Sequence, residues 1–210
     1  MTMRNTILSF TFLAGVLLIC SGCGTFHALT YDGHNTYRTV EATNYGFTRN
    51  FPKSFTVYPF KNTSWYQEAA DRGRQAVYQG FTLIGPCTRP DETERLAAQP
   101  YNASDALKVA RQQNSDAVII GEVMNQDHFW FFLMSYSYVM LKINIYDTRD
   151  GRLIYSGNTW GIDSDFGLSI LSPVTSIIDH INWSRLTQGL YYRCAMDFVH
   201  DVRPDVTVTK

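Results

Sequence analysis

The apolar pattern is most regular in the second half of the chain, between residues 102 and 160. Residues 116–123 (DAVIIGEV) form a short, mostly apolar run, which is typical of a strand buried on both faces. Residues 138–146 alternate instead, as a half-buried strand does, and Asp150-Gly151 predicts a tight turn into a returning strand that ends at Trp160. The residues predicted to share the buried side of the alternating strand are Val139, Leu141, Ile143 and Ile145.

The flanking segments predict helices and two further strands. Asn102 is placed to cap a helix that carries Asp105 in its first turn. Upstream, Ser64 and Gln67 fit a capping box for a helix that ends at Gly80. The predicted order is strands at 54–60 and 81–84, a brief helix from Pro90, the central segments above, and a last helix over 182–202.

This order predicts an α/β (α+β) fold with a single mixed sheet of about five strands flanked by helices. The predicted domain covers residues 51–204, followed by a polar tail at 205–210. Residues 23–50 are polar, without sustained periodicity, and are assigned to a tether that either holds the domain away from a membrane or packs along it.

The first 22 residues have the features of a signal peptide. Arg4 precedes an uncharged, mainly apolar run that ends at Cys20, which is shorter than the roughly 20 residues of a membrane-spanning helix. The run ends in Cys20-Ser21-Gly22-Cys23, which resembles the lipobox of bacterial lipoproteins, although Cys20 stands where Leu is usual. The resemblance implies cleavage before Cys23 and a diacylglycerol thioether on its sulfur. Gly24 in place of Asp implies the periplasmic face of the outer membrane. An ordinary secretory signal and an uncleaved anchor are the alternatives.

Composition limits the classes of partner. The 210-residue chain has a formal net charge of −1, so it offers no broad electrostatic attraction for nucleic acid.

The central segments also resemble a known group of envelope proteins. Residues 115–123 (SDAVIIGEV) and the hairpin at 141–157 (LKINIYDTRDGRLIYSG) are similar to the periplasmic α/β domain of the curli secretion channel subunit. The penicillin-binding-protein activator lipoproteins and the amino-terminal domain of TolB share this pattern. The resemblance implies a non-enzymatic accessory role in envelope assembly, secretion or cell-wall synthesis, with envelope protein partners and a candidate homo-oligomer.

One departure from that group concerns the membrane. The curli channel subunit inserts two β-hairpins, and each spanning strand needs roughly 9–11 residues. Residues 125–135 are too short for such a hairpin, whereas 161–183 are just long enough. In the second segment, however, apolar residues at helical spacing predict an amphipathic helix that begins at Pro173. A subunit of an oligomeric channel is therefore the more distant alternative. The helical positions are Val174, Ile177, Ile178 and Ile181.

Two apolar segments are candidates for partner or membrane contact. The amphipathic helix could lie on lipid, but packing on the sheet is favoured because it lacks basic residues. The second segment lies between two predicted strands, where a loop is expected. Its side chains form either an exposed tip or a buried extension of the following strand. They are Phe129, Trp130, Phe131, Phe132 and Leu133.

Candidate chemistry is sparse. Cys87 and Cys194 would form a disulfide in an oxidising periplasm if their Cα atoms lie within bonding distance, and two separate buried thiols are the alternative. The histidines show no zinc-binding spacing, and no motif predicts a cofactor. A cleft near Glu122 and His128 is the site that an enzyme or small-ligand binder would use. One carboxylate without a partner does not make an acid–base pair.

Overall fold

The computed structural model describes residues 36–47, 51–131, 134–166 and 173–205. These residues form one mixed seven-stranded sheet in the order β1-β7-β6-β5-β2-β4, with β3 also paired to β5. The predicted fold class is therefore confirmed, with seven strands in place of about five. The strands are β1 (Thr36–Asn44), β2 (Phe55–Val57), β3 (Lys61–Asn62), β4 (Cys87–Thr88), β5 (Ala117–Phe131), β6 (Met134–Asp147) and β7 (Leu153–Phe166).

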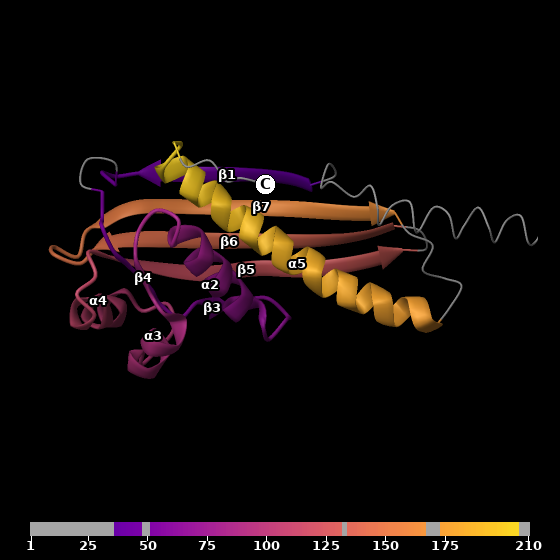
Figure 1. Cartoon of the computed structure of the whole chain (residues 1–210), viewed down its shortest axis with the longest axis horizontal. Coiled ribbons are helices and arrows are strands. Elements are labelled where there is room, and N and C mark those ends of the chain that lie inside the picture. Colours follow the sequence, from indigo (N-terminus) through magenta and orange to yellow (C-terminus); the bar gives the residue numbers. More distant parts are fainter. Residues whose placement is uncertain (1–35, 48–50, 132–133, 167–172, 206–210) are drawn as a thin grey trace, which may run out of the picture.

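Four described helices flank this sheet. Figure 1 shows α5 crossing the long strands diagonally beside α2, while α3 and α4 lie near the opposite end from the hairpin tip. Asn102 caps α4 as predicted, because its side chain accepts a hydrogen bond of 3.1 Å from the backbone N–H of Asp105. The helices are α2 (Ala69–Phe81), α3 (Pro90–Leu96), α4 (Ala103–Gln112) and α5 (Pro173–Val202).

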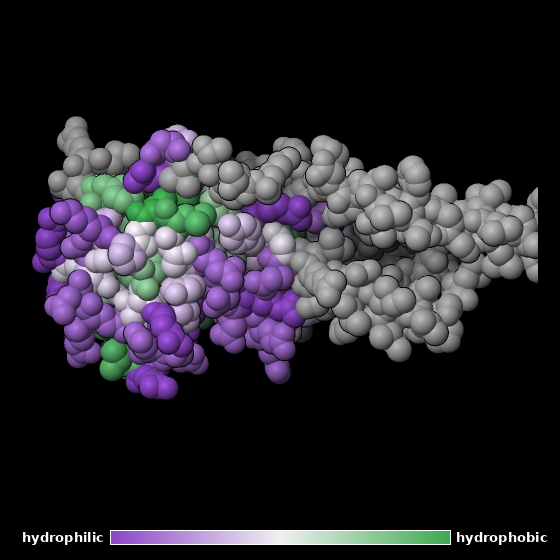
Figure 2. Space-filling view, in the orientation of Figure 1, coloured by the Kyte–Doolittle hydropathy of each residue, from purple (hydrophilic) through white to green (hydrophobic). Residues whose placement is uncertain are grey.

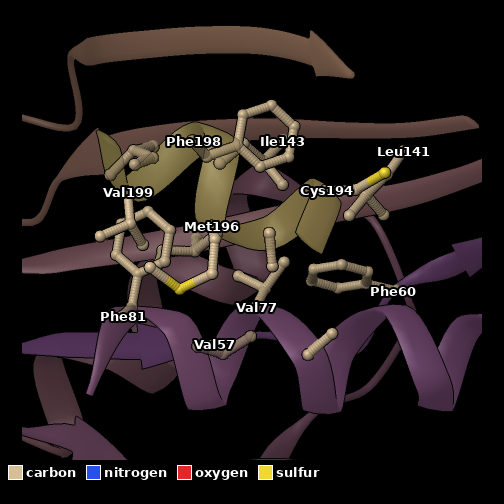
Figure 3. Close-up of a cluster of buried hydrophobic side chains, with 14 of the residues drawn as sticks. Val57, Phe60, Val77, Phe81, Leu141, Ile143, Cys194, Met196, Phe198 and Val199 are labelled. Carbon is tan, nitrogen blue, oxygen red and sulfur yellow. The ribbon is translucent and has the colours of Figure 1, made fainter. Parts of the chain in front are cut away.

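The main core fills the space between the sheet and the pair α2 and α5. Val139, Leu141, Ile143 and Ile145 are all fully buried, so the alternation predicted for β6 is confirmed. Figure 3 shows side chains of α2 and α5 meeting over this side of the sheet. Each such side chain contributes about 1.5–3 kcal/mol when it is fully buried. On the opposite face, α4 packs over β5 through a smaller cluster that contains Val118 and Ile120.

One edge strand of the sheet lies where the sequence predicted a tether. β1 falls within the predicted tether and pairs along its whole length with β7, from Thr36 opposite Asp163 to Asn44 opposite Tyr155. Phe47, just after β1, is fully buried. The sheet thus begins before the predicted domain boundary at residue 51. An edge strand with polar side chains lacks the apolar alternation by which strands are recognised.

The strand predicted at 81–84 is wrong. Phe81 is the last residue of α2, and the backbone continues in helical turns because the N–H groups of Thr82, Leu83 and Ile84 donate to carbonyls three or four residues earlier. The strand that follows α2 is instead β4, which pairs in parallel with β2. Helix α2 ends at Phe81, one residue after the predicted Gly80.

The surface on the α2 and α5 side is largely polar. Figure 2 shows hydrophilic and intermediate residues over the described part of this face, with a hydrophobic patch near the C-terminal part of α5. Charged side chains also form ion pairs here, such as the half-buried Arg72 with the exposed Glu68 at 2.9 Å. Pairs of this kind stabilise the fold only slightly.

Gly121 of β5 provides a test of this packing. A Cβ at this position would lie 2.1 Å from the ring of Phe60, which is itself 5% exposed. We expect Gly121→Ala to lower the free energy of unfolding by about 1–3 kcal/mol in urea titrations, because the ring must move within a packed core. In Gly189→Ala, the new Cβ would have only Arg193 Nη2 nearby, at 3.9 Å. This helical control should be neutral or stabilising by about 0.5–1 kcal/mol. Equal effects of the two substitutions would contradict the close packing at Gly121.

Candidate interaction surface

A β-bulge divides the long strands into two halves. In β5, Val123 pairs with Leu141 but Asn125 pairs with Met140, so Met124 is an extra residue. A shift of one residue moves every later side chain to the other face of a strand. We call the part of β5–β7 beyond this bulge the far half: residues 125–131, 134–140 and 160–166.

On the side that faces α5, the far half places polar side chains beside the buried Val139. Gln126 lies opposite Val139 and His128 lies opposite Ser137, so both follow the bulge onto the α5 face. The hydroxyl of Tyr191 on α5 donates a buried hydrogen bond of 2.8 Å to Gln126 Oε1. Burial is the largest cause that raises the pKa of Tyr191, so its hydroxyl stays protonated as a donor.

An ion pair continues this polar contact. Arg193 Nη2 lies 2.5 Å from Asp163 Oδ2, and the side chain of Asp163 is only 1% exposed. Nearby, Thr159 Oγ1 donates to Asp197 Oδ2 at 3.5 Å. The helix is therefore joined to β7 by hydrogen bonds and charge over the same stretch in which Leu190 and Cys194 enter the main core.

On the opposite face, the far half carries aromatic and apolar side chains. Phe129 stacks on Tyr136 with ring centroids 5.4 Å apart, and Tyr138 lies 6.3 Å from Trp160. Phe129 is 44% exposed, and the others are half-buried. Burial raises the pKa of Tyr138. The far half thus places Gln126 and Asp163 toward the helix and these four aromatic rings on the opposite face.

A second exposed apolar group lies beside the bulge. Trp65 is 96% exposed and Met124 is 40% exposed. The backbone N–H of Thr63 donates to Val123 O at 3.0 Å, and its hydroxyl donates to Met124 O at 3.1 Å, so the loop with Trp65 is held against β5. The Asn62 side chain accepts from Ser64 N at 2.9 Å and fixes the same loop.

The exposed position of Trp65 was not predicted from the sequence. The predicted capping box of Ser64 and Gln67 would place Trp65 in the first turn of a helix. The helix begins instead at Ala69, without a side-chain cap, and Ser64 belongs to the turn that Asn62 organises. A tryptophan next to an Asn-Thr-Ser turn was the signal that could have identified it.

The predicted loop at the end of β5 is wrong for the residues that can be compared. Phe129, Trp130 and Phe131 belong to β5, so they extend the preceding strand and not the following one, as the strand alternative had it. Phe129 does not enter the core, however, because the bulge turns it to the opposite face. The predicted helix from Pro173 is confirmed as the start of α5. Several predicted positions lie outside the described residues or have side chains outside the description: Cys23, Trp130, Phe131, Phe132, Leu133, Val174, Ile177, Ile178 and Ile181.

The predicted cleft near Glu122 and His128 is also wrong. Glu122 lies opposite Lys142 before the bulge, and His128 lies opposite Ser137 after it, so the two side chains are on different faces of the sheet. Glu122 instead forms an ion pair of 3.0 Å with Lys61. Within the described ranges, no group of three or more His, Cys, Asp or Glu side chains is placed to hold a metal ion.

The disulfide considered for Cys87 and Cys194 is not formed in the structure. Cys87 lies on β4 at the edge of the sheet, whereas Cys194 is buried in α5 near Leu141 of the central strand β6 (Figure 3). β4 and β6 are separated by β2 and β5, and each strand spacing is about 4.8 Å. Burial raises the pKa of the Cys87 thiol to about 12, which makes it a poor nucleophile at neutral pH.

Among the helices of the described chain, none combines the length and the apolar character needed to cross a membrane.

Comparison with known proteins gives a fold but no sequence family. No protein-family model matches the sequence, and no curated protein matches it. The dodecamer of a single-substitution variant of PelC from Paraburkholderia phytofirmans is similar in structure, with a TM-score of 0.50 and 15% identity over 76% of this chain and 96% of that chain. Lipoprotein GNA1162 from Neisseria meningitidis has a TM-score of 0.44 and 19% identity, covering 64% and 98%. LpoB from E. coli has a TM-score of 0.42 and 12% identity, covering 54% and 59%.

Of these, the PelC structure shows the fold. It confirms the predicted resemblance at the level of the fold.

The buried contact between Gln126 and Tyr191 can be tested by removing one partner. We expect Tyr191→Phe to lower the free energy of unfolding by about 1–3 kcal/mol, because it leaves the Gln126 amide oxygen buried without its donor. Urea titration measures this loss, and Tyr192→Phe on the half-buried next position is the matched control. Adding Gln126→Leu to Tyr191→Phe should recover part of the loss. A double variant that loses the sum of both effects would contradict a paired contact.

Proposed function

We propose that this protein is a lipoprotein of the bacterial envelope that acts as a non-enzymatic interaction protein in envelope assembly, secretion or cell-wall synthesis. Lipidation of Cys23 would hold it on the periplasmic face of the outer membrane. The lipobox-like residues 20–23 support the anchor, and the fold that the chain shares with PelC supports an envelope role.

The observation that carries the interaction role is the loop of Trp65 beside Met124. An almost fully exposed tryptophan is uncommon on a monomer, and tryptophan is enriched among the residues that dominate the energy of protein interfaces. The loop is fixed to β5 by the hydrogen bonds of Thr63, so little conformational entropy would be lost on binding. A rigid anchor of this kind suits a protein partner.

The partner is either a second copy of this chain or another envelope protein. The PelC structure is a dodecamer, which supports self-association of this chain as one form of the interaction. For the same reason a subunit of an oligomeric outer-membrane channel is kept as the second candidate function.

The non-enzymatic role is supported by the separation of Glu122 and His128. The enzyme or ligand-binder alternative depended on a shared cleft, and the sheet places these two side chains on opposite faces.

The anchor is tested with Cys23→Ala. We expect the wild-type protein to lack residues 1–22, to carry added lipid mass and to sediment with outer-membrane fractions. The variant should keep residues 1–22 and be lost from those fractions, because signal cleavage before the cysteine follows its lipidation. Mass spectrometry and density-gradient fractionation measure both properties. An unchanged mass and an unchanged fraction would refute the lipoprotein assignment.

The interaction surface is tested with a photo-crosslinking amino acid at position 65 in cells. We expect discrete adducts from position 65 and none from position 83, where Leu83 is 49% exposed on a separate turn. Trp65→Ala should weaken the complex by about 2 kcal/mol, or roughly 30-fold in affinity. An adduct of twice the chain mass identifies a second copy, and a different mass identifies another protein. Adducts from neither position, or equally from both, would contradict a partner surface at Trp65.

The size of the protein extracted in mild detergent separates the two candidate functions. A large ring that resists dissociation favours the channel subunit, and a small membrane-bound species favours the accessory protein.

A further inference from the structure

β1 begins at the same end of the sheet as the tip of the β5–β6 hairpin, in register with the far half. Thr36 pairs with Asp163 of β7, Asp163 pairs with Ser137 of β6, and Ser137 pairs with His128 of β5. In Figure 1, β1 begins at the end of the molecule that also carries the ends of β5 and β7 and the start of β6. The chain therefore enters the folded domain beside the tip of the β5–β6 hairpin.

The length of the preceding segment limits how far this end can lie from the anchor. Thr36 follows Cys23 by 13 positions in the sequence. A fully extended chain of that length reaches about 45 Å. If Cys23 carries lipid, as proposed above, the far half is the end of the domain at which the anchored segment joins the fold.

The side chains that the far half turns away from α5 suit a lipid surface. Phe129, Tyr136, Tyr138, Met140, Trp160 and Ile162 share this face by register, and two ring pairs order four of them. Tyrosine and tryptophan combine an apolar ring with a polar group, which is the combination found at the boundary between acyl chains and headgroups. Nearby charges are few: Asp127 is exposed beside Tyr138, and Lys142 marks the border with the near part of the sheet.

We infer that this aromatic face of the far half rests on the bilayer into which Cys23 is anchored and forms a second, direct lipid contact of the folded domain. The inference depends on the proposed lipidation of Cys23. Because the face carries little charge, the contact depends on burial of apolar surface and not on anionic headgroups. It is distinct from the Trp65 loop, which belongs to the segment beside the bulge and is assigned to a protein partner.

Tryptophan fluorescence provides the test. The full-length lipidated protein is reconstituted into phosphatidylcholine vesicles whose acyl chains carry bromine near the headgroups, and into unbrominated vesicles as reference. The chain has four tryptophans, so Trp160→Phe removes the contribution of this face and Trp65→Phe is the matched control. We expect bromolipid to quench the wild type, Trp160→Phe to lose part of that quenching, and Trp65→Phe to lose none. The quenching should persist in high salt.

Every other outcome overturns the inference. The outcomes also distinguish failure of the second lipid contact from failure of the proposed lipid anchor. Protein that fails to float with vesicles refutes the lipid anchor and the second contact together. Protein that floats but shows the same quenching with and without Trp160 refutes the lipid contact alone. Emission of Trp160 that changes with protein concentration and not with bromolipid would assign the face to a second copy. A second variant, Trp160→Tyr, controls for a packing defect caused by one replacement. It keeps a large ring and must lose the same quenching as Trp160→Phe.

Discussion

The extra residue in β5 determines what the rest of the sheet presents to its surroundings. Before Met124, the side chains that face α2 and α5 are apolar, and Val123 is the last of them on β5. After it, Gln126 occupies the same side and bonds to Tyr191. A regular ladder would have turned Gln126 to the opposite face and Phe129 toward α5. The bulge therefore places the polar side chain of Gln126 under the helix and the ring of Phe129 on the opposite face.

Helix α5 lies across both environments, which explains its mixed composition. Its C-terminal part contributes Phe198, Val199 and Val202 to the main core. Farther back along the helix, Arg193 bonds to Asp163 and Tyr191 bonds to Gln126. Hydrogen bonds in a buried layer contribute little net stability while both partners are present, but losing one partner is costly. The two kinds of contact alternate along the helix, because Leu190 and Cys194 are buried in the main core between these paired residues.

Regular elements with a strong apolar period were predictable from the sequence. The alternation of β6, the buried start of β5 and the Asn102 cap of α4 follow local rules that tertiary contacts did not override. β1 was not predictable, because it is a polar edge strand whose pairing depends on β7, more than a hundred residues away. The bulge was invisible for a similar reason: the extra residue is defined only by the register of the partner strand. Trp65 was missed because a turn that Asn62 organises has the same Ser-x-x-Gln pattern as a capping box.

The pairing of β1 with β7 has a mechanical consequence. β1 is joined to the sheet along nine residue pairs, and its first residue faces the segment that leads back to Cys23. Tension on that segment, directed along the strand, would act on the ladder in shear and load its hydrogen bonds together instead of opening them one after another. A strand held in this way resists force much better than one peeled from its end. The edge strand would then serve as the joint through which the domain withstands the pull of its own anchor.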